Sequence, residues 1–259
     1  MINLKDFSGR RWLVVLGAAF AIALLNMNHT IHGAIINVDT QVAIKMNSIL
    51  DINPILDETL AWSSTRLGDA FMFTCLSLLF FVHALRGGSH NETSKRLSYW
   101  IWLAMLCLII YMISCASEYL IKRDTPIFSL HHFYNLQTKY GVMLHSCPTS
   151  SFPSGHGLAY IFFAMMAWQR YFRVSLLLWC LAFIMLSVRL IVGLHWLSDI
   201  VIGSLFLSTL FVTLIGDTSL KNTYKLSEQA VSRVFGMLSD WRDRCCEVII
   251  QRGNHKRIS

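Results

Sequence analysis

Six apolar stretches follow one another along the chain, and they constrain the fold more than any other feature. They cover roughly residues 12–27, 69–85, 97–120, 157–169, 174–192 and 197–216. Most of them approach the length of about 20 residues that a helix needs to cross the hydrocarbon core of a bilayer. Charged residues make up 14% of the chain, whereas a soluble domain usually carries about 25%. We therefore expect an all-α integral membrane bundle of six helices.

The basic residues between these stretches predict the orientation of the bundle. With the N-terminus in the cytoplasm, sixteen Lys and Arg residues fall in the inner segments and six in the outer segments. Basic residues collect on the cytoplasmic side of membrane proteins. We therefore expect both termini in the cytoplasm. The first stretch, 12–27, has no small-residue cleavage site after it and is expected to remain as an uncleaved signal anchor.

The C-terminal segment differs in composition from the rest of the chain. We expect a membrane domain over residues 1–220 and a basic cytoplasmic tail over 221–259. Within the tail, residues 226–250 place apolar side chains on one face of an amphipathic helix. This helix is expected on the inner membrane surface, and a partner-binding or dimerising helix is the alternative. The net charge of +7 accompanies no nucleic-acid-binding motif, so the expected partner is the membrane and not a nucleic acid.

Three polar residues surround the junction between the fifth and sixth stretches. Arg189 lies near the outer end of the fifth, where a charge indicates a functional site, although snorkelling to the headgroups is an alternative. His195 and Asp199 are four residues apart, a spacing that places them on one face of a helix. A carboxylate on one ring nitrogen leaves the other free as a nucleophile or base. Helix capping is the alternative reading of Asp199.

A second polar element, Pro153-Ser154-Gly155-His156, leads directly into the fourth apolar stretch. The hydroxyl of Ser154 and the free backbone N–H groups of a helix N-terminus can bind an anion. Gly155 allows a phosphate to approach closely, and His156 could protonate a leaving oxygen. A plain turn before a helix is the alternative.

Lys122 and Arg123, at the end of the third stretch, form a third candidate element. Taken alone, such a pair is most often an interfacial anchor. In the predicted topology, however, all three elements lie on the outer side of the membrane. Their convergence favours a site for a phosphate group.

Together, these residues resemble the type 2 phosphatidic-acid phosphatase family. The family pattern is a Lys-and-Arg-Pro element, then Pro-Ser-Gly-His, then Arg, five residues, His, three residues and Asp. Residues 153–156 match the second element, and Arg189, His195 and Asp199 match the third without gaps. The resemblance covers the whole chain, because family members typically have six spans and a site that faces outward. It implies an enzyme that acts on lipid phosphates.

The resemblance also implies a role for each matched residue. His195 would attack phosphorus to form a phosphohistidine, with Asp199 orienting its ring, and His156 would protonate the leaving group. Arg189, Ser154 and the Gly155 amide would hold the phosphate oxygens. No metal or other cofactor is implied.

The first element departs from the family pattern. Where members carry Lys, six residues and Arg-Pro, this chain has Lys122-Arg123-Asp124-Thr125-Pro126, so Arg123 is expected to replace the missing arginine as a phosphate ligand beside Lys122. This short form, together with residues 65–69 (Thr-Arg-Leu-Gly-Asp), resembles the lipid A 1-phosphate phosphotransferase subgroup. That subgroup can carry Pro-Gly-Asp-His where this chain has Pro-Ser-Gly-His.

The subgroup passes a phosphate from undecaprenyl diphosphate to lipid A at the periplasmic face of a bacterial inner membrane. One alternative is a phosphatase acting on undecaprenyl diphosphate, lipid A or phosphatidylglycerol phosphate. Another is a non-enzymatic transporter that uses His131, His132 and His145. The sequence does not indicate the oligomeric state.

Overall fold

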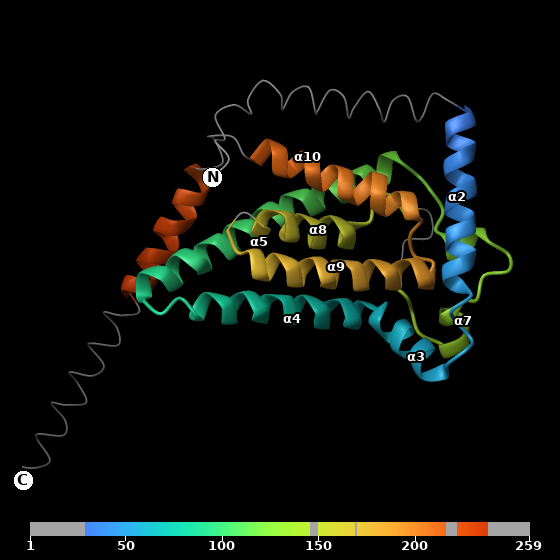
Figure 1. Cartoon of the computed structure of the whole chain (residues 1–259), viewed down its shortest axis with the longest axis horizontal. Helices are drawn as coiled ribbons and strands as arrows, with labels where there is room; N and C mark the ends of the chain where they lie inside the picture. Colours follow the sequence, from blue (N-terminus) through green and yellow to red (C-terminus); the bar gives the residue numbers. More distant parts are fainter. Residues whose placement is uncertain (1–28, 146–149, 169, 216–221, 238–259) are drawn as a thin grey trace, which may run out of the picture. The chain divides into compact units, whose positions relative to one another are not determined.

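The computed structural model describes residues 29–145, 150–168, 170–215 and 222–237, and every named element in these ranges is a helix. The elements, drawn in Figure 1, are α2 (His29–Asn47), α3 (Pro54–Ser63), α4 (Arg66–Leu85), α5 (His90–Leu120), α6 (Pro126–Ser129), α7 (Leu136–Tyr140), α8 (Gly155–Trp168), α9 (Phe172–Val192), the π-helix η2 (Asp199–Leu205) and α10 (Phe206–Ile215). The expectation of an all-α protein is confirmed for this part of the chain.

Several of these helices have the length and composition of membrane spans. Those long and apolar enough to cross a bilayer are Arg66–Leu85, His90–Ala116 and Phe172–Val192. The apolar helices Gly155–Trp168 and Asp199–Thr213 are shorter and coincide with the fourth and sixth predicted stretches. The first predicted span, 12–27, lies outside the described residues. The chain is thus a helical membrane protein, and its total of six spans remains a prediction.

From the sequence, the segment from residue 28 to 67, between the first two apolar stretches, is expected to form an outer loop. The structure differs from this expectation. Helices α2 and α3 occupy most of it. Pro54 is the first residue of α3, where the missing N–H costs nothing. The Asn53 side chain caps that helix, because its Oδ1 accepts from the N–H of Ile55 at 2.9 Å.

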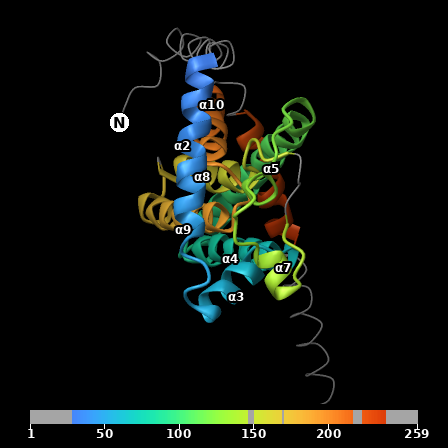
Figure 2. The same ribbon diagram turned by 90° about the vertical axis from the view of Figure 1, so that its right-hand side faces the viewer.

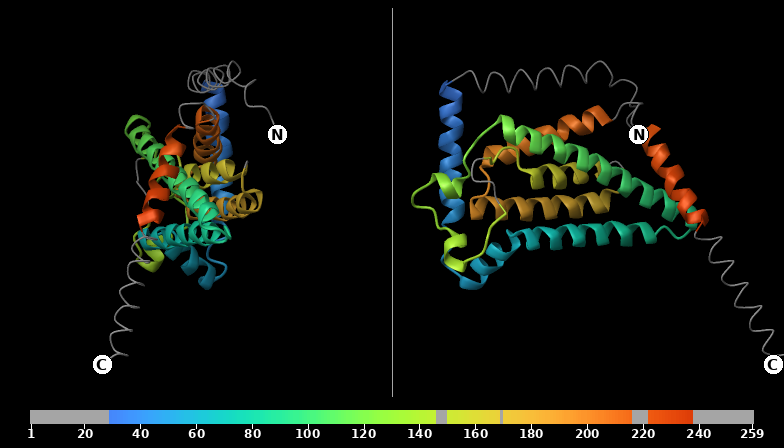
Figure 3. Two further views of the ribbon diagram at one scale, coloured as in Figure 1. Left: turned by 90° about the vertical axis from the view of Figure 1, so that its left-hand side faces the viewer. Right: turned by 180° about the vertical axis from the view of Figure 1, so that it is seen from behind.

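The described chain forms two compact units, and the first holds residues 29–74 and 105–215. In this unit α8 lies between α9 and α10, as Figures 1 and 3 show. Two glycines allow the close approach of α8 and η2. A Cβ on Gly157 would lie 2.5 Å from Ser204 Oγ, and one on Gly203 would lie 2.8 Å from Pro153 Cβ. The glycines therefore bring the Pro-Ser-Gly-His segment against the start of η2.

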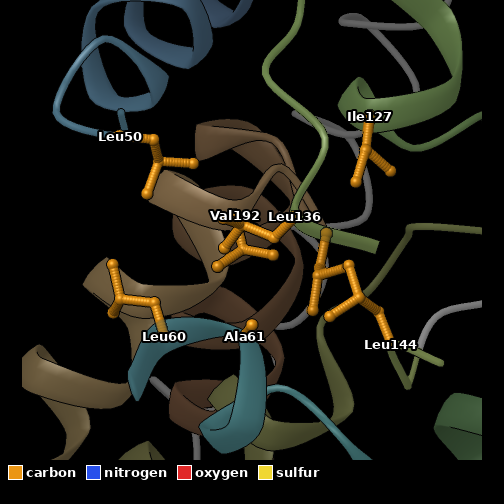
Figure 4. Close-up of a cluster of buried hydrophobic side chains, with 8 residues drawn as sticks. Leu50, Leu60, Ala61, Ile127, Leu136, Leu144 and Val192 are labelled. Carbon is orange, nitrogen blue, oxygen red and sulfur yellow. The ribbon is translucent and has the colours of Figure 1, made fainter. Parts of the chain in front are cut away.

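A hydrophobic cluster fixes the C-terminal end of α9 in the same unit. Its buried members are Leu50, Leu60, Ala61, Ile127, Leu136, Leu144, Val192 and Leu194, most of which Figure 4 labels. Helix α2 crosses the end of α9, and α3 packs on α7 (Figure 2). Gly193 ends α9 with φ of 80°, a conformation that side chains disfavour. The chain turn that follows Arg189 is thus held by packing on several sides.

The second unit contains residues 75–104 and 222–237. The rings of Phe80 and Trp100 stack at 4.2 Å, and Trp102 Nε1 donates to Thr223 Oγ1 at 2.9 Å. Residues 222–237 are helical and include the start of the predicted amphipathic helix, whose remainder lies outside the described residues. Its place on the membrane surface, and the division into a 1–220 domain and a tail, remain predictions.

Candidate active site

One carboxylate, that of Asp69 near the start of α4, connects three cationic or titratable side chains. Its Oδ1 accepts a hydrogen bond from Arg189 Nη2 and lies 3.1 Å from His156 Nε2. Its Oδ2 lies 2.5 Å from His145 Nδ1. Arg189 Nη2 is also 3.3 Å from His156 Nε2. The structure therefore brings the predicted residues Arg189 and His156 together, and adds Asp69 and His145 to them.

Arg189 is completely buried, yet its guanidinium is only partly satisfied. Its Nε and Nη1 atoms have no hydrogen-bond partner among the described residues. A buried charged donor without an acceptor is costly. The two unpaired donors point to an anionic ligand with several oxygen acceptors, which a phosphate group supplies.

His195 lies in the turn between α9 and η2, not on a helix. Its Nδ1 is 2.7 Å from the carbonyl oxygen of Ser151. Because a carbonyl can only accept, Nδ1 carries the hydrogen and Nε2 keeps its lone pair. Asp199 Oδ2 lies 3.9 Å from Nδ1, too far for a hydrogen bond. The expectation that a shared helix face pairs His195 with Asp199 was wrong, because the backbone of Ser151 takes that position.

The surroundings of His195 favour its neutral form. Burial, together with the smaller effect of the positive charges of Arg189 and His156, lowers the pKa of His195 to about 3, although the hydrogen bond to the Ser151 carbonyl opposes this shift. The ordinary value is about 6.5. The ring is therefore neutral near pH 7, with the Nε2 lone pair available to attack an electrophile.

Arg123 has a different environment from the one that the sequence predicts. Its Nη1 donates to Asp199 Oδ1 at 2.6 Å and to Ser198 Oγ at 2.7 Å, and its Nη2 to Asp39 Oδ2 at 2.5 Å. These contacts turn the guanidinium toward protein carboxylates. Lys122 is exposed and forms no ion pair with the residues that the structure describes. Arg123 therefore binds beside the turn that carries His195, through Ser198 and Asp199.

Ser154 and Gly155 begin α8 as the sequence predicts, but the serine hydroxyl is already used. Ser154 is fully buried, and its Oγ accepts from the N–H of Gly157 at 3.3 Å, which caps the helix. At Gly155 a Cβ would lie 3.5 Å from the Tyr111 ring, an ordinary contact. The packing of the protein therefore does not itself require glycine at position 155.

Comparison with known proteins finds a family model and a curated protein that resemble this chain. Residues 98–223 match the family model of the PAP2 superfamily. This region of the chain is similar to the PAP2 superfamily. It is 22% identical to lipid A 1-diphosphate synthase of Escherichia coli (strain K12) over 176 residues, which are 67% of this chain and 73% of that protein. The expectation of a membrane enzyme acting as a lipid phosphatase or phosphotransferase is confirmed at this level.

A solved structure also matches the chain. It is that of the PAP2-type phosphatidylglycerolphosphate phosphatase from Bacillus subtilis, with a TM-score of 0.45 and 16% sequence identity. The match covers 82% of this chain and 96% of that one.

Four residues of the site do not belong to the PAP2 pattern that the sequence analysis recognised. Asp39 lies in a segment expected to be a loop, and Ser151 acts through its backbone carbonyl. No sequence motif therefore indicates either residue. Asp69 ends the Thr-Arg-Leu-Gly-Asp segment that resembled the phosphotransferase subgroup, which was its only signal. His145 was considered solely for a transporter.

Asp69, His145 and His156 could also hold a metal ion. One ligand atom from each lies within 4.8 Å of the others. However, Asp69 Oδ1 already accepts from the Arg189 guanidinium. The adjacent positive charge disfavours a cation and favours an anion at this position.

Proposed function

We propose that this protein is a PAP2-type enzyme that moves phosphate from undecaprenyl diphosphate to lipid A 1-phosphate through a phosphohistidine at His195. The observation that carries the phosphate chemistry is the buried Arg189 guanidinium, whose Nε and Nη1 lack acceptors beside His156. The choice of donor and acceptor is supported by the likeness to lipid A 1-diphosphate synthase and by the short Lys122-Arg123 element.

In the first step of this mechanism, Nε2 of His195 attacks the terminal phosphorus of the donor. The new P–N bond forms as the bond from phosphorus to the bridging oxygen breaks, and undecaprenyl phosphate leaves with that electron pair. His156 gives its proton to the leaving oxygen. Arg189 stabilises the charge that develops on the phosphoryl oxygens. The Ser151 carbonyl accepts from Nδ1–H of His195 and so stabilises the ring as it becomes positive.

In the second step, an oxygen of lipid A 1-phosphate attacks the phosphohistidine. The P–N bond breaks, its electron pair returns to Nε2 of His195, and His156 accepts a proton if the acceptor carries one. Water in place of the acceptor oxygen converts the same step into hydrolysis. The phosphatase reading therefore uses the same residues and differs only in the acceptor.

The remaining predicted residues receive supporting roles. Asp199 and Arg123 hold the turn that carries His195, through contacts at 2.6 Å between them and at 2.8 Å from the Trp196 N–H to Asp199. Ser154 caps α8, and the Gly155 N–H is offered to a phosphate oxygen. Lys122 acts at longer range through its charge. We place the site at the periplasmic face of a six-span inner-membrane protein, a topology supported by the distribution of basic residues.

The test uses purified protein and undecaprenyl diphosphate labelled on its terminal phosphate, with and without lipid A. Transfer predicts that the label appears on lipid A, and that this product is absent with His195→Ala. Free phosphate released equally in both tubes would contradict transfer and leave the phosphatase reading. If His195→Ala kept all phosphate release, catalysis at this site would be wrong in either form.

A further inference from the structure

His145 is outside the PAP2 pattern, yet it is held close to the candidate acid. Its Nδ1 lies 2.5 Å from Asp69 Oδ2, and its ring centre is 6.1 Å from that of His156. Its backbone N–H donates to the carbonyl of Ser64 at 2.8 Å. His145 is thus held by one contact of its backbone and one of its side chain, and Nε2 is the remaining polar atom of its ring.

The exposed side of His145 lines a pocket of about 460 Å³. The wall of this pocket is apolar over much of its area, with Trp62, Leu67, Phe128, Val142, Met143 and Leu144 among its members. Met143 is 82% exposed and Leu67 70%, which is unusual for apolar side chains unless lipid or a ligand covers them. The pocket therefore suits an amphiphilic molecule.

Arg66 supplies a positive charge to the same pocket. It begins α4, is exposed, and makes no ion pair within the described part of the chain. With His145 it gives the pocket two groups able to bind an anion, beside an apolar wall. A lipid phosphate has the matching chemistry, a negative head and an apolar chain.

The pocket wall is preformed. Leu144 pairs with Thr65 through a backbone bridge, so the segment that carries Met143 and His145 is attached to the start of α4. A Cβ on Gly68 would lie 2.4 Å from the Trp62 carbonyl oxygen, which shows how closely α4 packs on the end of α3. Binding here needs little reorganisation of the backbone.

We propose that this pocket, with Arg66 and His145, binds the second phosphate of a lipid diphosphate, the one that is not transferred. The inference rests on the proposed function, because it takes the reacting phosphate to bind at Arg189 and His156. Both the donor diphosphate and the diphosphate product carry a phosphate next to the transferred group. One subsite therefore serves both half-reactions and selects diphosphates over monophosphates.

Asp69 connects the two phosphate positions. It binds Arg189 and His156 through Oδ1 and His145 through Oδ2. The contact of Nδ1 with Asp69 leaves Nε2 as the atom of the His145 ring that is available to a bound phosphate. The carboxylate thereby holds the donors for both phosphates in a fixed relation.

The experiment compares labelling of the full-length enzyme by farnesyl diphosphate and by farnesyl phosphate, each carrying label on its terminal phosphorus. Single-turnover formation of phosphoenzyme is measured, so no acceptor is needed. Arg66→Gln should slow labelling by the diphosphate about ten- to hundredfold, the effect of losing one charged hydrogen bond, and change labelling by the monophosphate less than threefold. Met143→Glu places a negative charge in the pocket and should have the same selective effect.

Lys45→Gln is the matched control, because Lys45 is an exposed cation that does not line the pocket. It should leave both reactions unchanged. If Arg66→Gln and Met143→Glu slowed labelling by both substrates equally, or by neither, the second-phosphate subsite would be refuted. Phosphoenzyme formation by the wild-type enzyme would still support the proposed function. If the wild-type enzyme formed no phosphoenzyme from either substrate, the proposed function would fail, and the subsite with it.

Discussion

Arg189→Lys is the substitution whose effect follows most directly from the site geometry. Lysine keeps the positive charge and can still pair with Asp69, so the fold should survive. It cannot replace Nε and Nη1, the two donors without a protein acceptor. A hydrogen bond to a charged group contributes about 1.5–3 kcal/mol, so two such bonds at the lower end of that range give about 3–4 kcal/mol. At about 1.4 kcal/mol for each factor of ten, phosphoenzyme formation should slow about 100- to 1,000-fold.

The assay is single-turnover labelling by a lipid diphosphate, with the thermal unfolding midpoint measured in detergent as a check on the fold. Arg123→Lys is the control, because its guanidinium binds Asp39 and Asp199 and has no place at the phosphate in this account. Its rate should stay within about tenfold of wild type. A rate for Arg189→Lys within fivefold of wild type, in folded protein, would refute the assignment of its unpaired donors to phosphate.

Three further outcomes follow from the same structure. Gly193→Ala should destabilise the protein by about 2–4 kcal/mol, because φ is positive at this position and the new Cβ would lie 2.2 Å from the Phe133 ring. The measurement is the thermal unfolding midpoint, which should fall. Gly155→Ala should leave the unfolding midpoint unchanged, because the new Cβ would lie 3.5 Å from Tyr111, an ordinary contact distance. It should slow phosphoenzyme formation about 10- to 100-fold, because the methyl group would obstruct the phosphate. An unchanged rate would contradict that role of Gly155. The pKa of His195 in the folded protein is lowered to about 3, so as the pH falls the histidine becomes protonated in the unfolded chain before it does so in the folded protein. The stability of the protein should therefore decline below about pH 6.5. His195→Gln should show a smaller decline in stability between about pH 7.5 and 5.

The sequence predicts the helical membrane fold and the two ungapped PAP2 elements because both are local patterns. The length of an apolar stretch indicates a membrane span. The Pro-Ser-Gly-His element and the spacing of Arg189, His195 and Asp199 can be read directly from neighbouring positions in the sequence. The contacts that complete the site are not local. Asp69 meets His145 and Arg189 across 76 and 120 residues, and no spacing rule relates such distant positions.

The partners of Arg123 and His195 could not be predicted for a related reason. The sequence shows that Arg123 is a cation near the site, but not that Asp39 from a supposed loop would bind it before a phosphate could. The tautomer of His195 depends on the carbonyl of Ser151, a backbone atom that every residue type supplies. Asp199 was the expected partner because side-chain chemistry is visible in a sequence and backbone position is not.

The central claim is that His195 carries the phosphoryl group. The most direct measurement is to quench the reaction of wild-type enzyme with a labelled lipid diphosphate, digest the protein under basic conditions and map the labelled residue. The account predicts an acid-labile, base-stable phosphohistidine at position 195, formed before product and absent from His195→Ala. Label on His156 or His145 instead, or product formation with no labelled enzyme at any time, would contradict it.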